Sequence, residues 1–120
     1  MIETTAGDFQ FFKDAVKHYC DRLKISGWDM RFRHDLVEDG FACTRTDCDN
    51  RVVEFRLTTH WRDDVWVLDD ERLDYCARHE AGHLFQRRVF ALAEARYVTE
   101  LELDTLDEEM AIRIAELLDE

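Results

Sequence analysis

Apolar residues recur every three or four positions in the first part of the chain. The pattern covers residues 7–24 and places these side chains on one face of a helix: Phe9, Phe12, Val16, Tyr19, Cys20 and Leu23. Thr5 followed by Asp8 has the spacing of a capping box, and Gly27 suits the turn after the last helical residue. We therefore expect an amphipathic helix over residues 7–24.

The next part of the chain alternates between apolar and polar side chains, as half-buried strands do. The alternation is clear over residues 28–33 and 53–58, and a shorter strand is expected over residues 41–45. Residues 37–40 and 46–50 contain the glycine, aspartate and asparagine typical of turns. The simplest interpretation is a three-stranded antiparallel meander.

Helical spacing returns after this predicted sheet. Asp69 or Asp70 is suited to cap a helix over residues 71–95. Thr99 with Glu102 has the signature of a second capping box, which would open a last helix ending near residue 118. The order of one helix, a small sheet and a helical hairpin predicts an α+β fold. We interpret residues 1–120 as a single domain.

The second of these helices contains an HExxH motif, formed by His79, Glu80 and His83. Side chains four residues apart lie on the same face of a helix, so both imidazoles can reach one zinc ion. Glu80 is placed beside the first histidine as the general base that takes a proton from the attacking water. Gly82 is unfavourable inside a helix, so we expect it to permit the close approach of a neighbour or a substrate strand.

A catalytic zinc site needs a third protein ligand. The residues after His83 do not continue as the His-x-x-Gly-x-x-His of metzincins, so we expect a carboxylate from the last helix. If that helix returns antiparallel to the motif helix, it reaches the level of the zinc near residues 107–109. We favour Glu108, which falls within the apolar arc of the helix. Asp104, Asp107 and Glu109 stay open, and Asp104 is either an orienter of a histidine or the ligand itself.

The motif and its surroundings resemble a family of small zinc metallopeptidases found in phage and prophage genomes. The resemblance rests on residues 79–83, 92–100 and 107–109. Further positions fit the pattern in the first half of the chain: Trp28, Ala42, Val53, Leu57 and Trp61. The resemblance implies a minimal gluzincin-like zincin fold, with a sheet edge that holds a peptide or protein substrate, the HExxH helix, and a glutamate ligand on the following helix.

The charge of the chain narrows the possible partners. The formal net charge is -12, so a polyanion would be repelled, and we expect neither nucleic acid nor an anionic membrane surface as a partner. The chain has no apolar run of membrane-spanning length and no secretory signal at its start, so we expect a cytoplasmic protein of a bacterial host or its phage. Two functions stay open. One is a zinc peptidase, and the other is an inactive zincin-fold protein whose acidic surface engages a basic partner as an anti-host factor.

A few other residues are candidates for supporting roles. His60, Tyr75, Arg96 and Tyr97 flank or occupy the motif helix and are candidates to stabilise an oxyanion. Trp28, Trp61 and Trp66 are expected in the core or at its edge. The cysteines, Cys20, Cys43, Cys48 and Cys76, are expected as free thiols in a reducing compartment, although Cys43 and Cys48 flank a turn and are able to approach each other.

Overall fold

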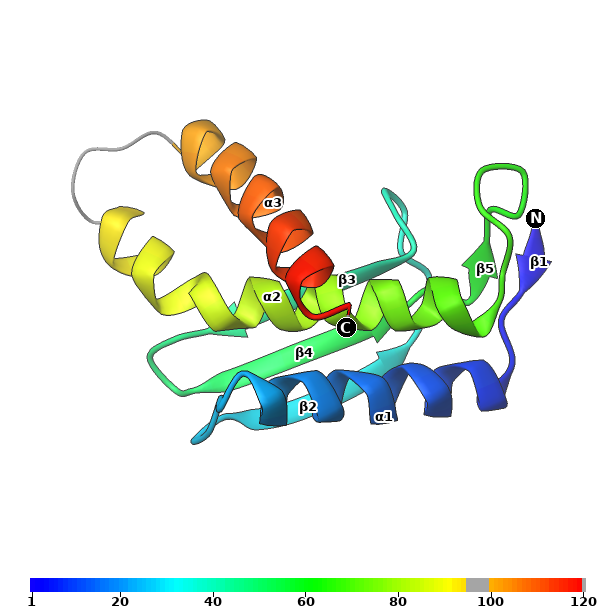
Figure 1. The fold of residues 1–120 in the computed structure, drawn as a ribbon, viewed down its shortest axis with the longest axis horizontal. Coiled ribbons are helices and arrows are strands. Elements are labelled where there is room, and N and C mark those ends of the chain that lie inside the picture. The colour runs from blue at the N-terminus through cyan, green and yellow to red at the C-terminus, as the bar shows by residue number, and fades with distance from the viewer. Residues whose placement is uncertain (95–99, 120) are drawn as a thin grey trace.

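The structure, a computed structural model, describes residues 1–94 and 100–119, which form three helices and two small sheets (Figure 1). In chain order the elements are β1 (Ile2–Glu3), α1 (Ala6–Arg22), β2 (Asp29–His34), β3 (Ala42–Asp47), β4 (Val52–Leu57), β5 (His60–Trp61), α2 (Asp70–Glu94) and α3 (Glu100–Leu117). The predicted α+β class and the predicted order of elements are confirmed. Among the described residues, no helix has both the length and the apolar composition needed to cross a bilayer.

The helix starts follow the capping signals in the sequence. The Asp8 backbone N–H donates to the Thr5 hydroxyl at 3.0 Å, and the Thr5 backbone N–H donates to the Asp8 carboxylate at 2.8 Å, so the first capping box is confirmed. At the start of α2, the Arg72 backbone N–H donates to the Asp69 carboxylate at 2.8 Å. Asp69 is therefore the cap of α2. The capping box expected at Thr99 falls outside the described residues.

The three-stranded sheet has the order β2-β4-β3, and the predicted antiparallel meander is wrong for its first strand. β3 and β4 form the expected antiparallel hairpin, but β2 pairs in parallel with the other edge of β4. The central place of β4 follows from its apolar residues Val53, Phe55 and Leu57, which are each 0% exposed and gain most from neighbours on both sides. Residues 35–41 carry the chain from one edge of the sheet to the other.

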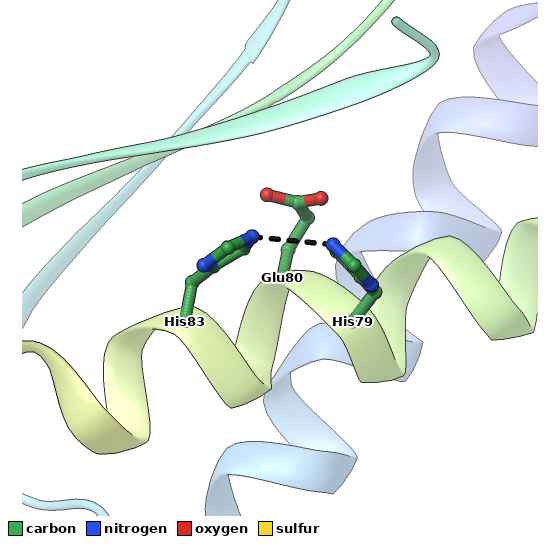
Figure 2. A group of neighbouring side chains, drawn as sticks. All are labelled: His79, Glu80 and His83. Carbon is green, nitrogen blue, oxygen red and sulfur yellow. Dashed lines mark hydrogen bonds between the residues drawn. The ribbon is translucent and has the colours of Figure 1, made fainter. Parts of the chain in front are cut away.

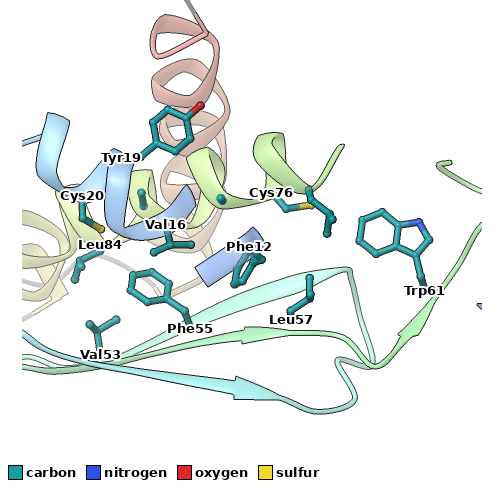
Figure 3. Packing of buried hydrophobic residues seen from close by; sticks show 13 residues of the cluster. Phe12, Val16, Tyr19, Cys20, Val53, Phe55, Leu57, Trp61, Cys76 and Leu84 are labelled. Carbon is teal, nitrogen blue, oxygen red and sulfur yellow. The ribbon is translucent and has the colours of Figure 1, made fainter. Parts of the chain in front are cut away.

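The hydrophobic core lies between the sheet and two helices, α1 and α2 (Figures 1 and 3). Its buried side chains come from one face of each element: Phe12, Val16, Tyr19 and Cys20 of α1, Val53, Phe55 and Leu57 of β4, and Leu73, Cys76, Ala77, Ala81 and Leu84 of α2, together with Trp61. Trp61 is thus a core residue, as expected, and Trp28 is partly buried against the core. Trp66 is 36% exposed and lies at the core's edge.

α3 packs on α2 through small residues and polar ties. A Cβ atom at Gly82 would lie 3.3 Å from Ile114 Cγ2 and 3.5 Å from Ala111 Cα, so the close approach expected at this glycine is confirmed, and α3 is the neighbour. The guanidinium group of the buried Arg78 donates to the Ala115 carbonyl and pairs with Asp74 at 3.1 Å. These contacts fix the C-terminal half of α3 on the middle of α2.

Candidate metal centre

The HExxH motif lies in the middle of α2, and its side chains point toward the sheet (Figure 2). Ligand atoms of His79, Glu80 and His83 lie within 4.8 Å of one another. The two Nε2 atoms are 3.2 Å apart, because the four-residue spacing places both imidazoles on one helix face, where the rings meet edge-on. The structure therefore brings together the three residues that the motif singled out.

α3 adds a carboxylate that contacts both imidazoles. Glu108 Oε2 lies 3.1 Å from His79 Nε2, and Glu108 Oε1 lies 2.9 Å from His83 Nε2. This is the residue that the sequence favoured as third ligand. Exposure does not separate the candidates, because the Glu108 side chain is 60% exposed and those of Asp104 and Glu109 are exposed too. Both carboxylate oxygens of Glu108 are thus directed at the point where the Nε2 atoms converge.

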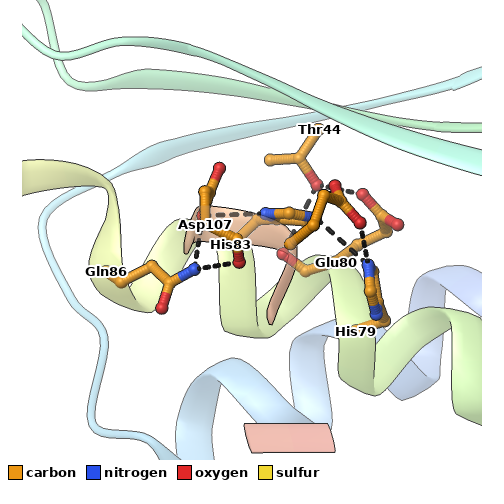
Figure 4. Close-up of polar contacts among 7 residues, drawn as sticks. Thr44, His79, Glu80, His83, Gln86 and Asp107 are labelled. Atoms are coloured by element: carbon orange, nitrogen blue, oxygen red, sulfur yellow. Dashed lines mark hydrogen bonds and ion pairs between the residues drawn. The ribbon is translucent and has the colours of Figure 1, made fainter. Parts of the chain in front are cut away.

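Asp107 orients one of the histidines from the opposite side (Figure 4). Its Oδ1 atom lies 3.0 Å from His83 Nδ1, and the Gln86 amide N–H donates to the Asp107 carbonyl at 2.7 Å and to the same Oδ1 atom. A carboxylate on the second imidazole nitrogen fixes which nitrogen faces a metal. Asp104 was one candidate to orient a histidine. On α3, however, Asp104 is exposed to solvent, whereas Asp107 faces His83. His79 Nδ1 is buried without a hydrogen-bond partner among the described residues.

The pKa values of His83 and Asp107 reflect the contact between the two side chains. Burial alone would lower the pKa of His83, but the hydrogen bond to Asp107 and the nearby carboxylates of Glu80 and Glu108 outweigh it and raise that pKa. Burial alone would raise the pKa of Asp107, but its bonds to His83 and Gln86 outweigh it and lower that pKa. Asp107 is therefore held as a carboxylate beside the imidazole.

Glu80 lies deepest in the site and has a partner that the sequence did not indicate. The Thr44 hydroxyl, from β3, donates to Glu80 Oε1 at 2.7 Å (Figure 4). Glu80 is 6% exposed, and burial raises the pKa of its carboxyl, although His83 and the Thr44 hydrogen bond partly oppose that shift. A raised pKa makes a carboxylate a stronger base, which suits a group that must accept a proton. The contacts of Glu80 to Thr44, and of Glu108 to the imidazoles, give the two carboxylates different positions in the site.

A half-open cleft of about 780 Å³ contains the motif. It lies between β3 on one side and α2 and α3 on the other, and its lining includes Phe41, Ala42, Cys43, Thr44, Thr46, Trp66, Tyr75, His79, Glu80, His83, Arg87, Asp107, Glu108 and Ile112. β3 is an edge strand, and no described strand pairs with its outer edge. The cleft therefore follows a free strand edge past the motif.

The register of the sheet determines which backbone groups of β3 face the cleft. The Thr58 N–H donates to the Phe41 carbonyl at 2.9 Å, so residues 41, 43, 45 and 47 turn their backbone groups to β4. The N–H and C=O groups of Ala42, Thr44 and Thr46 consequently point away from β4, along the free edge. All three residues line the cleft. An extended peptide would find alternate hydrogen-bonding groups there.

Of the described residues expected as candidates to stabilise an oxyanion, one lies in the cleft. Tyr75 lines the cleft, with its ring centre 6.1 Å from that of His79. His60 is exposed on β5, and its Nδ1 atom lies 2.9 Å from the Thr59 hydroxyl, outside the cleft lining. Arg96 and Tyr97 fall outside the described residues.

The cysteines are free thiols, as expected. Cys20 and Cys76 are buried, and burial raises the pKa of each thiol to about 12. Cys43, within β3, and Cys48, in the turn that follows, are not bridged. None of the four therefore forms a cross-link that would stabilise the site.

The donor set at the cleft is of a kind that holds a metal ion. Two imidazole nitrogens and one carboxylate are a known ligand set of catalytic zinc, and here they are directed at one point from two helices. Comparisons with known proteins give no independent identification, because no family model, curated protein or solved structure matches the chain. The resemblance to small phage metallopeptidases thus stays a prediction.

Proposed function

We propose that this protein is a zinc-dependent peptidase in which His79, His83 and Glu108 hold the ion. The observation that supports this best is the contact of one Glu108 carboxylate with both imidazole Nε2 atoms, at 3.1 and 2.9 Å. Glu80 is also near the imidazoles, but its Oε1 atom is held by Thr44. We therefore assign Glu108 as the ligand and Glu80 as the base.

Each residue then has a distinct task in peptide hydrolysis. A zinc ion, when bound, supplies a Lewis acid that polarises the carbonyl and makes a water molecule more acidic. Glu80 accepts the proton of the attacking water and passes it to the leaving amine. The Thr44 hydroxyl keeps Oε1 of that carboxylate in place. Asp107 holds His83 in the orientation that leaves Nε2 free for the metal.

The free edge of β3 supports a peptide as the substrate. The outward backbone groups of Ala42, Thr44 and Thr46 can bind an extended chain by strand addition. The Thr44 side chain also contacts the base, so a peptide paired with the Thr44 backbone passes close to Glu80. The same geometry is difficult to use for a substrate without a repeating amide backbone.

Metal analysis tests the proposed ligands. We expect purified protein to hold about one zinc per chain, and we expect His79→Ala, His83→Ala and Glu108→Ala to lose it under the same dialysis. Glu109→Ala, which removes the next carboxylate of the same helix, is the matched control and should keep it. Equal zinc content in all of these proteins would refute the proposed site.

Peptide turnover tests the proposed role of Glu80. Glu80→Gln should retain zinc and lose hydrolysis of any peptide that the wild type cleaves, because glutamine cannot accept the proton. Unchanged turnover would remove Glu80 from the mechanism. Zinc binding without turnover of any peptide by the wild type would instead support the acidic interaction protein.

A further inference from the structure

One end of the cleft is built from aromatic side chains. Phe41 precedes β3, Trp66 lies in the loop between β5 and α2, and Tyr75 lies in the first part of α2. The rings of Phe41 and Trp66 stack with centres 4.8 Å apart, and Tyr75 meets Trp66 edge-on at 6.4 Å. We call these three residues the aromatic wall. All three line the same cleft as the HExxH motif.

The aromatic wall is fixed before any ligand binds. The indole N–H of the fully buried Trp61 donates to the Trp66 carbonyl at 2.8 Å, which anchors the loop to the core. Trp61 also packs against Phe41, with ring centres 4.4 Å apart. The Arg72 guanidinium lies 4.1 Å from the centre of the Trp66 ring. Trp66 nevertheless stays 36% exposed and lines the cleft, so part of its apolar surface is open to a ligand there.

The position of the aromatic wall relative to Glu80 defines a distance along a bound peptide. Phe41 precedes Thr44, the partner of Glu80, by three strand residues, or about 10 Å at roughly 3.3 Å per residue. Tyr75 precedes His79 by four helical residues, or about 6 Å. An extended peptide covers these distances in about two to three residues. The wall thus lies beyond the residues that flank the reacting bond.

The direction of β3 decides on which side of the bond the wall lies. β3 starts beside the aromatic wall at Ala42 and runs past Thr44 toward Thr46, on the side of Arg87. Antiparallel pairing is the more stable arrangement per residue, so a peptide added to the edge runs in the opposite direction. Its C-terminal part then reaches the aromatic wall.

We propose that the aromatic wall is a specificity subsite for an aromatic or large aliphatic side chain, two or three residues C-terminal to the cleaved bond. This inference rests on the proposed function for the location of that bond. The subsite itself requires only that a peptide pairs with β3.

Cleavage of a peptide mixture tests the position of the preference. Zinc-loaded wild type is incubated with blocked decapeptides of random sequence, and the products are sequenced by mass spectrometry. We expect Phe, Tyr, Trp and Leu to be enriched at the second or third residue after the cut. Trp66→Ala should remove this enrichment, whereas Val67→Ala, which changes an exposed neighbour outside the cleft lining, should keep it. Cleavage without preference at these positions would overturn the proposal.

A binding measurement separates this proposal from peptidase activity. Zinc-loaded Glu80→Gln protein is titrated with blocked decapeptides of alanine and lysine that carry one Phe or, as the matched peptide, one Ser. Burial of the phenyl ring should make the Phe peptide bind about tenfold more tightly. Adding Trp66→Ala should abolish the difference, and adding Val67→Ala should not. If the wild type cleaves nothing but this pattern holds, the peptidase function fails and the subsite stands. Equal affinity for both peptides, or binding of neither, overturns the subsite.

Discussion

The residues that meet at the candidate metal centre come from two parts of the molecule with different anchoring. His79, Glu80 and His83 project from α2, and an adjoining face of the same helix belongs to the core with α1 and the sheet. Glu108 projects from α3, where Leu101 and Leu117 are 76% and 72% exposed and the buried residues are Leu103, Ala111 and Ala115. The first part is held by large apolar side chains. The second is held by a close helix contact and a few polar ties.

This difference assigns separate tasks to the two parts. The core with α2 sets the spacing of the imidazoles and the depth of Glu80. The α3 helix carries Glu108, the third ligand of the proposed set, and Asp107, which contacts His83 Nδ1. Metal affinity should therefore be sensitive to changes at the α2–α3 contact that leave the core unchanged. Changes in the core should affect the stability of the fold, the spacing of the imidazoles and the position of Glu80 together.

The largest effect is expected in the core, from Phe55→Ala. Phe55 is 0% exposed on the central strand, and truncation of such a ring lowers the free energy of unfolding by about 3–5 kcal/mol. Urea denaturation measures the loss. Leu101→Ala, at a residue of α3 that is 76% exposed, should change it by less than about 0.5 kcal/mol. Equal effects of the two variants would contradict the difference in anchoring.

A smaller effect on stability, but a clear one on metal binding, is expected from Gly82→Val. The added side chain meets Ile114 and Ala111, so α3 must move away from α2, with a loss of about 1–3 kcal/mol in the free energy of unfolding. Zinc affinity, measured by competition with a chromophoric chelator, should fall because Glu108 leaves the imidazoles. Phe85→Val introduces the same side chain at an exposed position of α2 and should retain the wild-type affinity. Unchanged affinity in Gly82→Val would show that α3 does not supply a ligand.

Asp107→Asn should weaken zinc binding without displacing the helix. Loss of the carboxylate beside His83 Nδ1 typically lowers metal affinity by about 10–100-fold. The same chelator competition measures it, with Asp104→Asn as an exposed control on the preceding turn of α3. An equal affinity of the two variants would exclude Asp107 as the orienter of His83.

The smallest effect is expected from Thr44→Val, which removes a hydroxyl and keeps the branched shape. Loss of its hydrogen bond to the Glu80 carboxylate should lower kcat by about tenfold, with zinc content unchanged. Thr44→Ser restores the donor and should restore most of the rate. A similar loss of kcat in both variants would indicate a packing role for Thr44 rather than a role in positioning the base.

The sequence predicted those features that depend on local spacing. The first helix, expected over residues 7–24 and found over Ala6–Arg22, follows from contacts within a few residues, as do its cap Thr5 and the motif face of α2. For the cap of α2 the sequence offered Asp69 or Asp70, and the structure has Asp69. Glu108 was favoured because the rise per residue gives the position at which an antiparallel helix reaches the level of the motif. Helical angles then give the face on which Glu108 lies.

Features that depend on distant parts of the chain were not predictable in the same way. The parallel pairing of β2 with β4 depends on which strand the two helices bury. The alternation of apolar and polar residues along β2 is the same whether the strand pairs in parallel or antiparallel. Thr44 lies thirty-six residues from Glu80, and no spacing rule links a strand hydroxyl to a helix carboxylate. Asp107 and Asp104 differ by less than one turn, so only the packing of α3 separates the orienter from a solvated residue.

The free edge of β3 also affects how copies of this protein behave toward one another. Backbone groups that are open to a peptide are equally open to a strand of a second copy, and unpaired edges of this kind promote aggregation. A net charge of -12 opposes such encounters through repulsion between copies. Salt screens this repulsion over about 8 Å at physiological ionic strength. The acidic surface thus favours colloidal stability in a protein whose sheet edge stays open.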